Sequence, residues 1–171
     1  MEMNDFYELI VGGDNQLQTL VECNQYTKKF GLSLTEKEAL ILVKDRKDSL
    51  KEQQRVEFGE SILNKLIFAF CDSAYLYQEN YVDSIGRLQD IFYLFKNETM
   101  DELTDDELID YMRKSFEEEC KGSFDYLEDT ILDRLAREVR LGIHRFMGGR
   151  VKASEDSSYD DYVDEYEGDY E

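Results

Sequence analysis

The stretch 61-SILNKLIFAFC-71 decides the fold, because it is apolar on nearly every side when it is wound into a helix. A surface helix would carry a single apolar stripe, whereas this one needs neighbours around it. The 171 residues contain no proline, and the strongest apolar patterns elsewhere repeat every three or four positions. We therefore expect an all-α protein in which a helix starting near Gly59 forms the axis of the core.

Two helix-start motifs lie on either side of this stretch. The motif 35-TEKE-38 is a capping box, in which the Thr hydroxyl accepts from a backbone N–H and the second Glu reaches back to the Thr N–H. The motif 104-TDDE-107 repeats the same chemistry. The first predicts a helix that runs to about Gln54, and the second predicts a helix that ends at Gly122.

Further helical segments complete a compact bundle of about five to six helices. Gly31 is well placed as the left-handed C-terminal stop of the first helix. The remaining helical segments are 14–31, about 78–97, and the one that Ser123 caps. The pattern loosens before Gly148, so we expect 1–150 to form one helical domain of ordinary size.

A chemically distinct tail is expected at 151–171. Ser154–Glu171 carry nine carboxylates and no basic residue, so nearly half of the chain's net charge of −20 lies there. Like-charge repulsion and Gly168 disfavour a helix in isolation, which predicts a disordered acidic tail. It either keeps the protein soluble or folds on binding, since four tyrosines would share one helical face: Tyr159, Tyr162, Tyr166 and Tyr170.

The segment just before the tail is basic. Residues 134–152 have a net charge of +5, and tethered charges of opposite sign attract by about 0.2–1 kcal/mol per contact. An intramolecular contact between the tail and the last helix is therefore one predicted interaction. Its candidate residues on the helix side are Arg134, Arg137, Arg140 and Arg145.

Composition excludes several classes of partner and compartment. Outside the tail the net charge is −11, which opposes direct binding to nucleic acid or to an anionic membrane surface. Three scattered cysteines form no C-x-x-C pair, as expected for a reduced, cytoplasmic chain. The longest apolar run has six residues, and the start lacks the basic flank of a signal peptide.

Catalytic chemistry has little support in the sequence. His144 is the single histidine, and no phosphate-binding glycine motif or calcium-binding loop is present, so we predict no cofactor, no metal site and no catalytic residue. The enzymatic alternative is a carboxylate and tyrosine site near residues 72–81. The same segment between two predicted helices contains three tyrosines, which offer the rigid, amphipathic contacts that protein interfaces favour: Tyr75, Tyr77 and Tyr81.

Five segments of the chain carry a resemblance to a known family: 55-RVEFG-59, 65-KLIFAFCDS-73, 79-ENY-81, 95-FKNE-98 and 103-LTDDEL-108. They are similar to a family of small proteins from Firmicutes that is catalogued only as a domain of unknown function. The resemblance covers about Cys23 to Arg137 and leaves the tail outside. It implies a bacterial cytoplasmic protein and assigns no catalytic residue.

The leading hypothesis is a non-enzymatic protein-interaction or regulatory module with a protein partner. Its acidic tail would be a solubilising or autoregulatory element. One alternative is an acidic nucleic-acid mimic or inhibitor, in which the tail occupies the binding channel of a basic protein. The other alternative is the enzyme with a site near residues 72–81.

Overall fold

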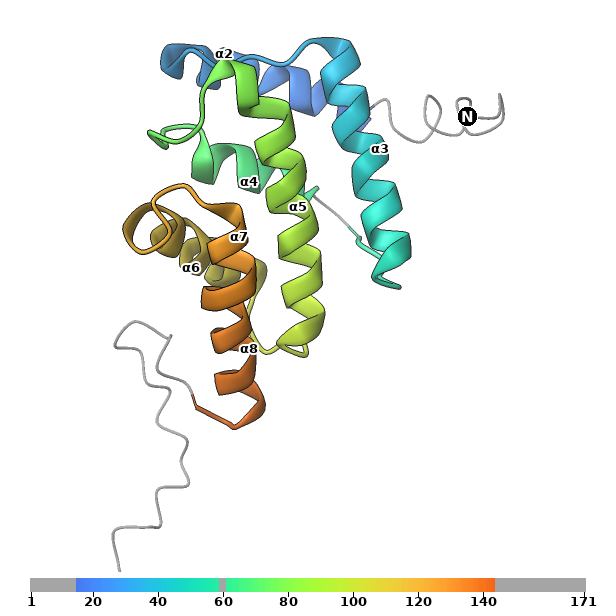
Figure 1. Cartoon of the computed structure of the whole chain (residues 1–171). Coiled ribbons are helices and arrows are strands. Elements are labelled where there is room, and N and C mark those ends of the chain that lie inside the picture. The colour runs from blue at the N-terminus through green and yellow to red at the C-terminus, as the bar shows by residue number, and fades with distance from the viewer. Residues whose placement is uncertain (1–14, 59–60, 144–171) are drawn as a thin grey trace, which may run out of the picture.

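Helices are the only regular elements among the residues that the computed structural model describes, 15–58 and 61–143 (Figure 1). The all-α prediction is confirmed for these residues, whereas the predicted tail lies outside them. After a helix at residues 15–22, the elements are α2 (Asn24–Thr27), η1 (Lys28–Phe30), α3 (Glu36–Glu52), α4 (Ile62–Phe70), η2 (Gln78–Asn80), α5 (Tyr81–Glu98), α6 (Asp105–Glu118), α7 (Phe124–Tyr126), η3 (Leu127–Leu132) and α8 (Asp133–Arg140).

The predicted capping boxes both form. At the start of α3, the Thr35 hydroxyl accepts from the Glu38 N–H at 3.1 Å, and the Glu38 carboxylate accepts from the Thr35 N–H at 3.2 Å. Thr104 and Glu107 make the same pair of bonds at the start of α6. Each box satisfies donors that the first turn of a helix leaves free, so these helix starts are fixed locally.

Glycine ends two segments where the sequence predicts it. Gly31 has a φ of +78° after η1, and Gly122 has a φ of +84° after α6. Residues with a side chain rarely adopt this left-handed conformation, which glycine adopts freely. Ser123 then caps α7 by accepting a hydrogen bond from the Tyr126 N–H, again as predicted.

The central helix is α5, not the apolar helix α4. It packs against α3, α4 and α6 and runs lengthwise through the molecule, with α3 on one side and α6 to α8 on the other (Figure 1). With 18 residues α5 is about 27 Å long, which gives it room for neighbours along its whole length. The shorter α4 is buried on most sides, but its Phe68 is 49% exposed. The prediction that α4 forms the core's axis was therefore wrong.

The last helical run contains a wider turn that the sequence pattern does not predict. Residues Leu127–Leu132 form a π-helix between α7 and α8. This winding lets Leu127, Ile131 and Leu132 all reach the core, where each is fully buried.

The amide of Gln89 is a polar group in the core of the bundle that lacks a hydrogen-bond partner among the described residues. Gln89 on α5 is fully buried, and neither its amide nitrogen nor its oxygen has a hydrogen-bond partner among the described residues. We expect Gln89→Leu to raise the free energy of unfolding by about 1 kcal/mol, because it removes an unsatisfied amide from the core. Urea denaturation measures this, with exposed Gln25→Leu as the control. A loss of stability would show that the amide is satisfied.

Candidate interaction surface

The segment Arg55–Phe58, here called the hook, inverts the usual distribution of side chains. It lies between α3 and α4, has no regular secondary structure, and alternates charged with apolar residues. The charged side chains of Arg55 and Glu57 are only 21% and 17% exposed. The apolar Val56 and Phe58 are 76% and 89% exposed. A segment that turns its charges inward and its apolar groups outward needs specific anchors to hold it.

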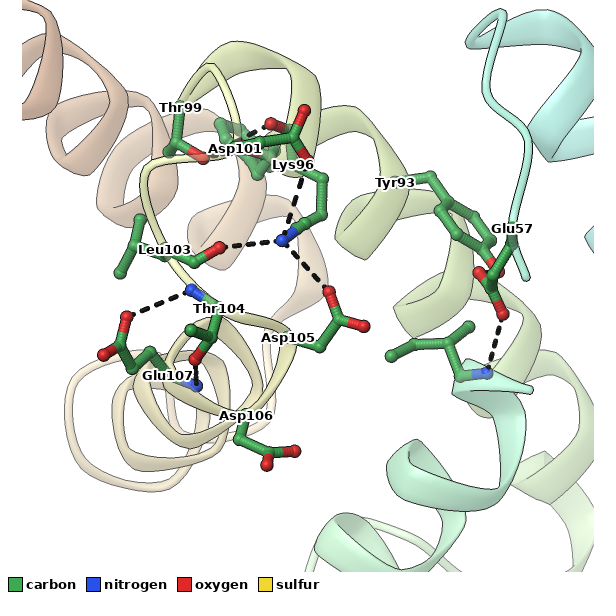
Figure 2. Close-up of polar contacts among 12 residues, drawn as sticks. Glu57, Tyr93, Lys96, Thr99, Asp101, Leu103, Thr104, Asp105, Asp106 and Glu107 are labelled. Carbon is green, nitrogen blue, oxygen red and sulfur yellow. Dashed lines mark hydrogen bonds and ion pairs between the residues drawn. The ribbon is translucent and has the colours of Figure 1, made fainter. Parts of the chain in front are cut away.

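Glu57 is the inner anchor of the hook. Its carboxylate accepts two hydrogen bonds from Arg46, at 2.9 and 3.3 Å, and one from the Ile62 backbone N–H at 3.1 Å. The Tyr93 hydroxyl donates to the other carboxylate oxygen, and Figure 2 shows the two groups face to face. Burial raises the pKa of the Tyr93 phenol, and Glu57 raises it further, so the phenol stays a neutral donor. Glu57 thereby joins α3, α4 and α5.

Arg55 is the outer anchor. Its guanidinium makes a two-pronged contact with the Asp101 carboxylate, at 2.7 and 3.1 Å, and also donates to the Asn97 side chain at 2.7 Å. Asn97 in turn donates to the Gln53 carbonyl at 2.8 Å. The Arg55 guanidinium holds the pKa of Asp101 below its usual range, so the pair stays ionised. The hook is therefore fixed to the turn that follows α5.

A buried lysine fixes that turn. Lys96 is 7% exposed, and its ammonium group donates to the Leu103 carbonyl at 2.7 Å. It also lies 3.0 Å from the Asp105 carboxylate and 3.6 Å from that of Asp101 (Figure 2). A buried ammonium requires such partners, because an unpaired charge in the core is strongly unfavourable. Lys96 thus sets the position of the carboxylate that Arg55 binds.

Residues with a strained backbone lie just before the hook and in the turn after α5 that the hook contacts. Gln54, Met100 and Asp101 have φ values of +55°, +54° and +55°, a left-handed conformation that is costly for residues with side chains. Met100 follows the end of α5 and is 58% exposed. It precedes Asp101, which Arg55 binds, so the turn to which the hook is fixed carries an exposed apolar side chain of its own. We call the exposed pair of the hook, Val56 and Phe58, the apolar tip.

The three tyrosines predicted to form an interface do not share a surface. Tyr81 is fully buried, so its assignment to an interaction surface was wrong: as the first residue of α5 it points into the core. Tyr75 is partly buried and packs edge-on against Phe116, with ring centroids 5.8 Å apart. Tyr77 alone is largely exposed, at 56%.

The described arginines of the basic segment already have partners on the body. Arg134 lies 3.4 Å from the Glu119 carboxylate, Arg137 pairs with Asp133, and Arg140 pairs with Glu98. A tail bound there would have to compete with these carboxylates. The other residues of the predicted contact lie outside the described residues: Arg145, Tyr159, Tyr162, Tyr166 and Tyr170.

The region of the enzymatic alternative, residues 72–81, and the adjoining Cys71 hold three groups whose pKa shifts do not suit acid–base chemistry at neutral pH. Asp72 pairs with Arg113 at 2.5 Å, and this contact lowers the pKa of the Asp72 carboxyl group. Burial raises the pKa of the Tyr81 phenol and of the Cys71 thiol. A shallow groove of about 480 Å³ begins at this region, lined by Asn80, Asp83, Ser84, Arg87, Ser123, Phe124 and Asp125.

Metal-binding clusters and membrane-spanning helices are both absent from the part of the chain that the structure describes. No three His, Cys, Asp or Glu side chains lie together in a way that would hold a metal ion within 15–58 and 61–143. None of the helices in these ranges is long and apolar enough to cross a membrane.

Comparison with known proteins shows similarity to a protein family. The model of a family of unknown function, DUF6323, matches residues 19–145. The match includes the hook, both of its anchors and the apolar tip, and it ends before Ser154. No curated protein and no solved structure matches the chain.

Proposed function

The chain belongs to this family of unknown function, and we propose that it is a non-enzymatic protein-interaction module. The hook is its binding element, and the apolar tip enters a pocket on a partner protein. The observation that supports this is the inversion at Arg55–Phe58, where charged side chains are held inside and apolar ones are displayed.

The exposure of apolar side chains and the burial of charged ones in the hook lower the stability of the isolated protein. Burying a side chain such as that of Phe58 contributes about 1.5–3 kcal/mol, and the folded chain leaves this contribution unused. It also desolvates Arg46 and Glu57, and it holds Gln54 in a left-handed conformation. Features that oppose stability and gather at one place are typical of binding sites, which proteins keep at the expense of stability.

The chemistry of the hook defines the partner. Phenylalanine is enriched in protein interfaces, where aromatic anchors fill apolar pockets. The exposed charges that flank the hook in the chain are of both signs, Lys51 and Glu52 at the end of α3, while Arg55 is already paired with Asp101. The partner we propose is therefore a protein with an apolar pocket that takes the exposed side chains of the hook.

The setting we propose is the cytoplasm. Cys23, Cys71 and Cys120 are free and buried, which suits a reducing compartment. A non-enzymatic role is supported by the paired Asp72 and the raised pKa values of Tyr81 and Cys71. The acidic tail, which begins after the family match, would regulate the module or keep it soluble.

We expect the double variant Val56→Ser, Phe58→Ser to lose about 30-fold or more in affinity for the partner, because buried aromatic anchors contribute 2 kcal/mol or more to binding. Its free energy of unfolding should stay within about 0.5 kcal/mol of the wild-type value, since both side chains are exposed. Proteins retained on the immobilised chain are compared by quantitative mass spectrometry, and thermal unfolding measures stability.

Leu141→Ser is the matched control, because Leu141 is 75% exposed and belongs to the turn after α8. The control should retain the same proteins as the wild-type chain. If the double variant also retains them all, the hook is not the binding element.

A further inference from the structure

A second exposed apolar surface lies away from the hook. Tyr26 from α2, Phe30 from η1 and Phe68 from α4 are 42%, 40% and 49% exposed. Their rings meet edge-on: Tyr26 and Phe30 have centroids 5.8 Å apart, and Tyr26 and Phe68 have centroids 5.3 Å apart. We call these three residues the aromatic patch. Three half-exposed rings in contact form one continuous surface rather than scattered apolar side chains.

The aromatic patch carries positive charge in a strongly acidic protein. The Lys29 ammonium lies over the Tyr26 ring, 3.8 Å from its centroid, and 5.2 Å from the centroid of Phe30. Lys28 is its exposed neighbour. Neither lysine forms an ion pair with any described residue, whereas the arginines of α8 are all paired. A ligand for this surface would combine aromatic rings with carboxylates.

The chain itself contains a segment of that composition. Ser154–Glu171 have nine carboxylates and four tyrosines. We propose that this segment binds the aromatic patch of its own chain, with tyrosine rings against the three aromatic residues and carboxylates beside Lys28 and Lys29. The sequence pattern predicts a contact between the tail and the last helix, but the described arginines of that helix are already paired with carboxylates. Lys28 and Lys29 form no ion pair with a described carboxylate.

The tail is long enough to reach the patch. Arg140, at the end of α8, pairs with Glu98 at the C-terminal end of α5. Ser33, shortly after the patch residue Phe30, is hydrogen-bonded to Gln78 just before α5 begins. The two places are therefore about one length of α5 apart, roughly 27 Å, and Figure 1 shows α2 and the end of α8 at opposite ends of the molecule. The sixteen residues that follow Ile143, up to Tyr159, span up to about 55 Å when extended.

Tethering makes even a weak contact effective. Because the tail and the patch belong to one chain, the effective concentration of the tail at the patch is on the order of millimolar, so a millimolar affinity would keep the tail bound much of the time. A bound tail would cover the patch and leave it free for a partner only after displacement. The aromatic patch and the hook share no residue, so the tail can bind the patch whether or not the hook binds a partner.

The test compares amide NMR spectra of the full chain with those of a chain that ends at Ala153. Removal of the tail should shift the resonances of Lys28, Lys29, Phe30 and Phe68, and a synthetic peptide of residues 154–171 added to the shortened chain should reverse the shifts. Lys28→Glu with Lys29→Glu should weaken peptide binding about tenfold or more. Both lysines are exposed, so this variant should keep its fold.

Arg134→Glu with Arg137→Glu is the matched control, and it should leave peptide binding unchanged. Shifts confined to α8 or to the hook, or the absence of shifts, would overturn the proposal. Shifts in the full chain that grow with protein concentration would overturn it as well, because they would show that the tail binds a second copy.

Discussion

Glu57→Ala should lower the free energy of unfolding by about 3 kcal/mol, the largest loss expected from any single side chain of the hook. The carboxylate accepts bonds from Arg46, Tyr93 and the Ile62 N–H. Without it, the buried guanidinium of Arg46 and the phenol of Tyr93 lose their common acceptor, and breaking a buried pair costs about 3–5 kcal/mol. Urea denaturation of the purified variant measures the loss.

Two further variants test whether the loss of stability comes from an unpaired buried charge and not from the removal of a carboxylate as such. Glu52→Ala, on the exposed end of α3, should change stability by less than about 0.5 kcal/mol. Arg46→Met combined with Glu57→Leu should recover most of the loss, because no unpaired charge remains in the core. If Glu57→Ala costs less than about 1 kcal/mol, the carboxylate does not anchor the hook.

Gly122→Ala should destabilise the protein by about 3 kcal/mol. At the φ of +84° found here, a side chain costs about 1–2 kcal/mol. The added Cβ would also lie 2.5 Å from the Cγ and Cδ1 atoms of Tyr75 and 2.9 Å from its Cβ. These atoms lie close to the backbone of Tyr75, so the overlap can be relieved only by moving the chain, at a further cost of about 1–3 kcal/mol. Thermal or urea unfolding measures the sum.

Gly142 supplies the control for this variant. Its φ of +72° is equally left-handed, but no described atom comes within 4 Å of a Cβ built there. Gly142→Ala should therefore lower the free energy of unfolding only by the cost of the left-handed backbone, about 1 kcal/mol. Equal losses at the two glycines would mean that Tyr75 does not press against Gly122.

The parts of the fold that depend on neighbouring residues could be predicted from the sequence. A capping box needs a Thr and a Glu three positions apart, so 35-TEKE-38 and 104-TDDE-107 already contain the whole structure of a helix start. The stop at Gly31 is equally local. The central position of α5 is different, because it depends on which helices meet, and the local pattern favours the more apolar α4.

The hook could not be found from local pattern alone. Arg55 and Asp101 are 46 positions apart, and the anchors of Glu57 come from three helices. The alternation of charged and apolar residues in 55-RVEF-58 was a usable signal of an extended segment, but it would have placed the charges outside. The tyrosines posed the same difficulty: nothing near Tyr81 in the sequence shows that it is fully buried while Tyr77 is exposed.

The most direct test of the hook is cross-linking from its tip. A photoreactive phenylalanine analogue is placed at position 58 in cells that express the protein, and at position 141 as an exposed apolar control. Position 58 should give one discrete cross-linked partner, which position 141 does not give and which weakens when Val56 is also replaced by serine. No adduct at position 58, or the same adducts at both positions, would contradict the role of the hook as the binding element.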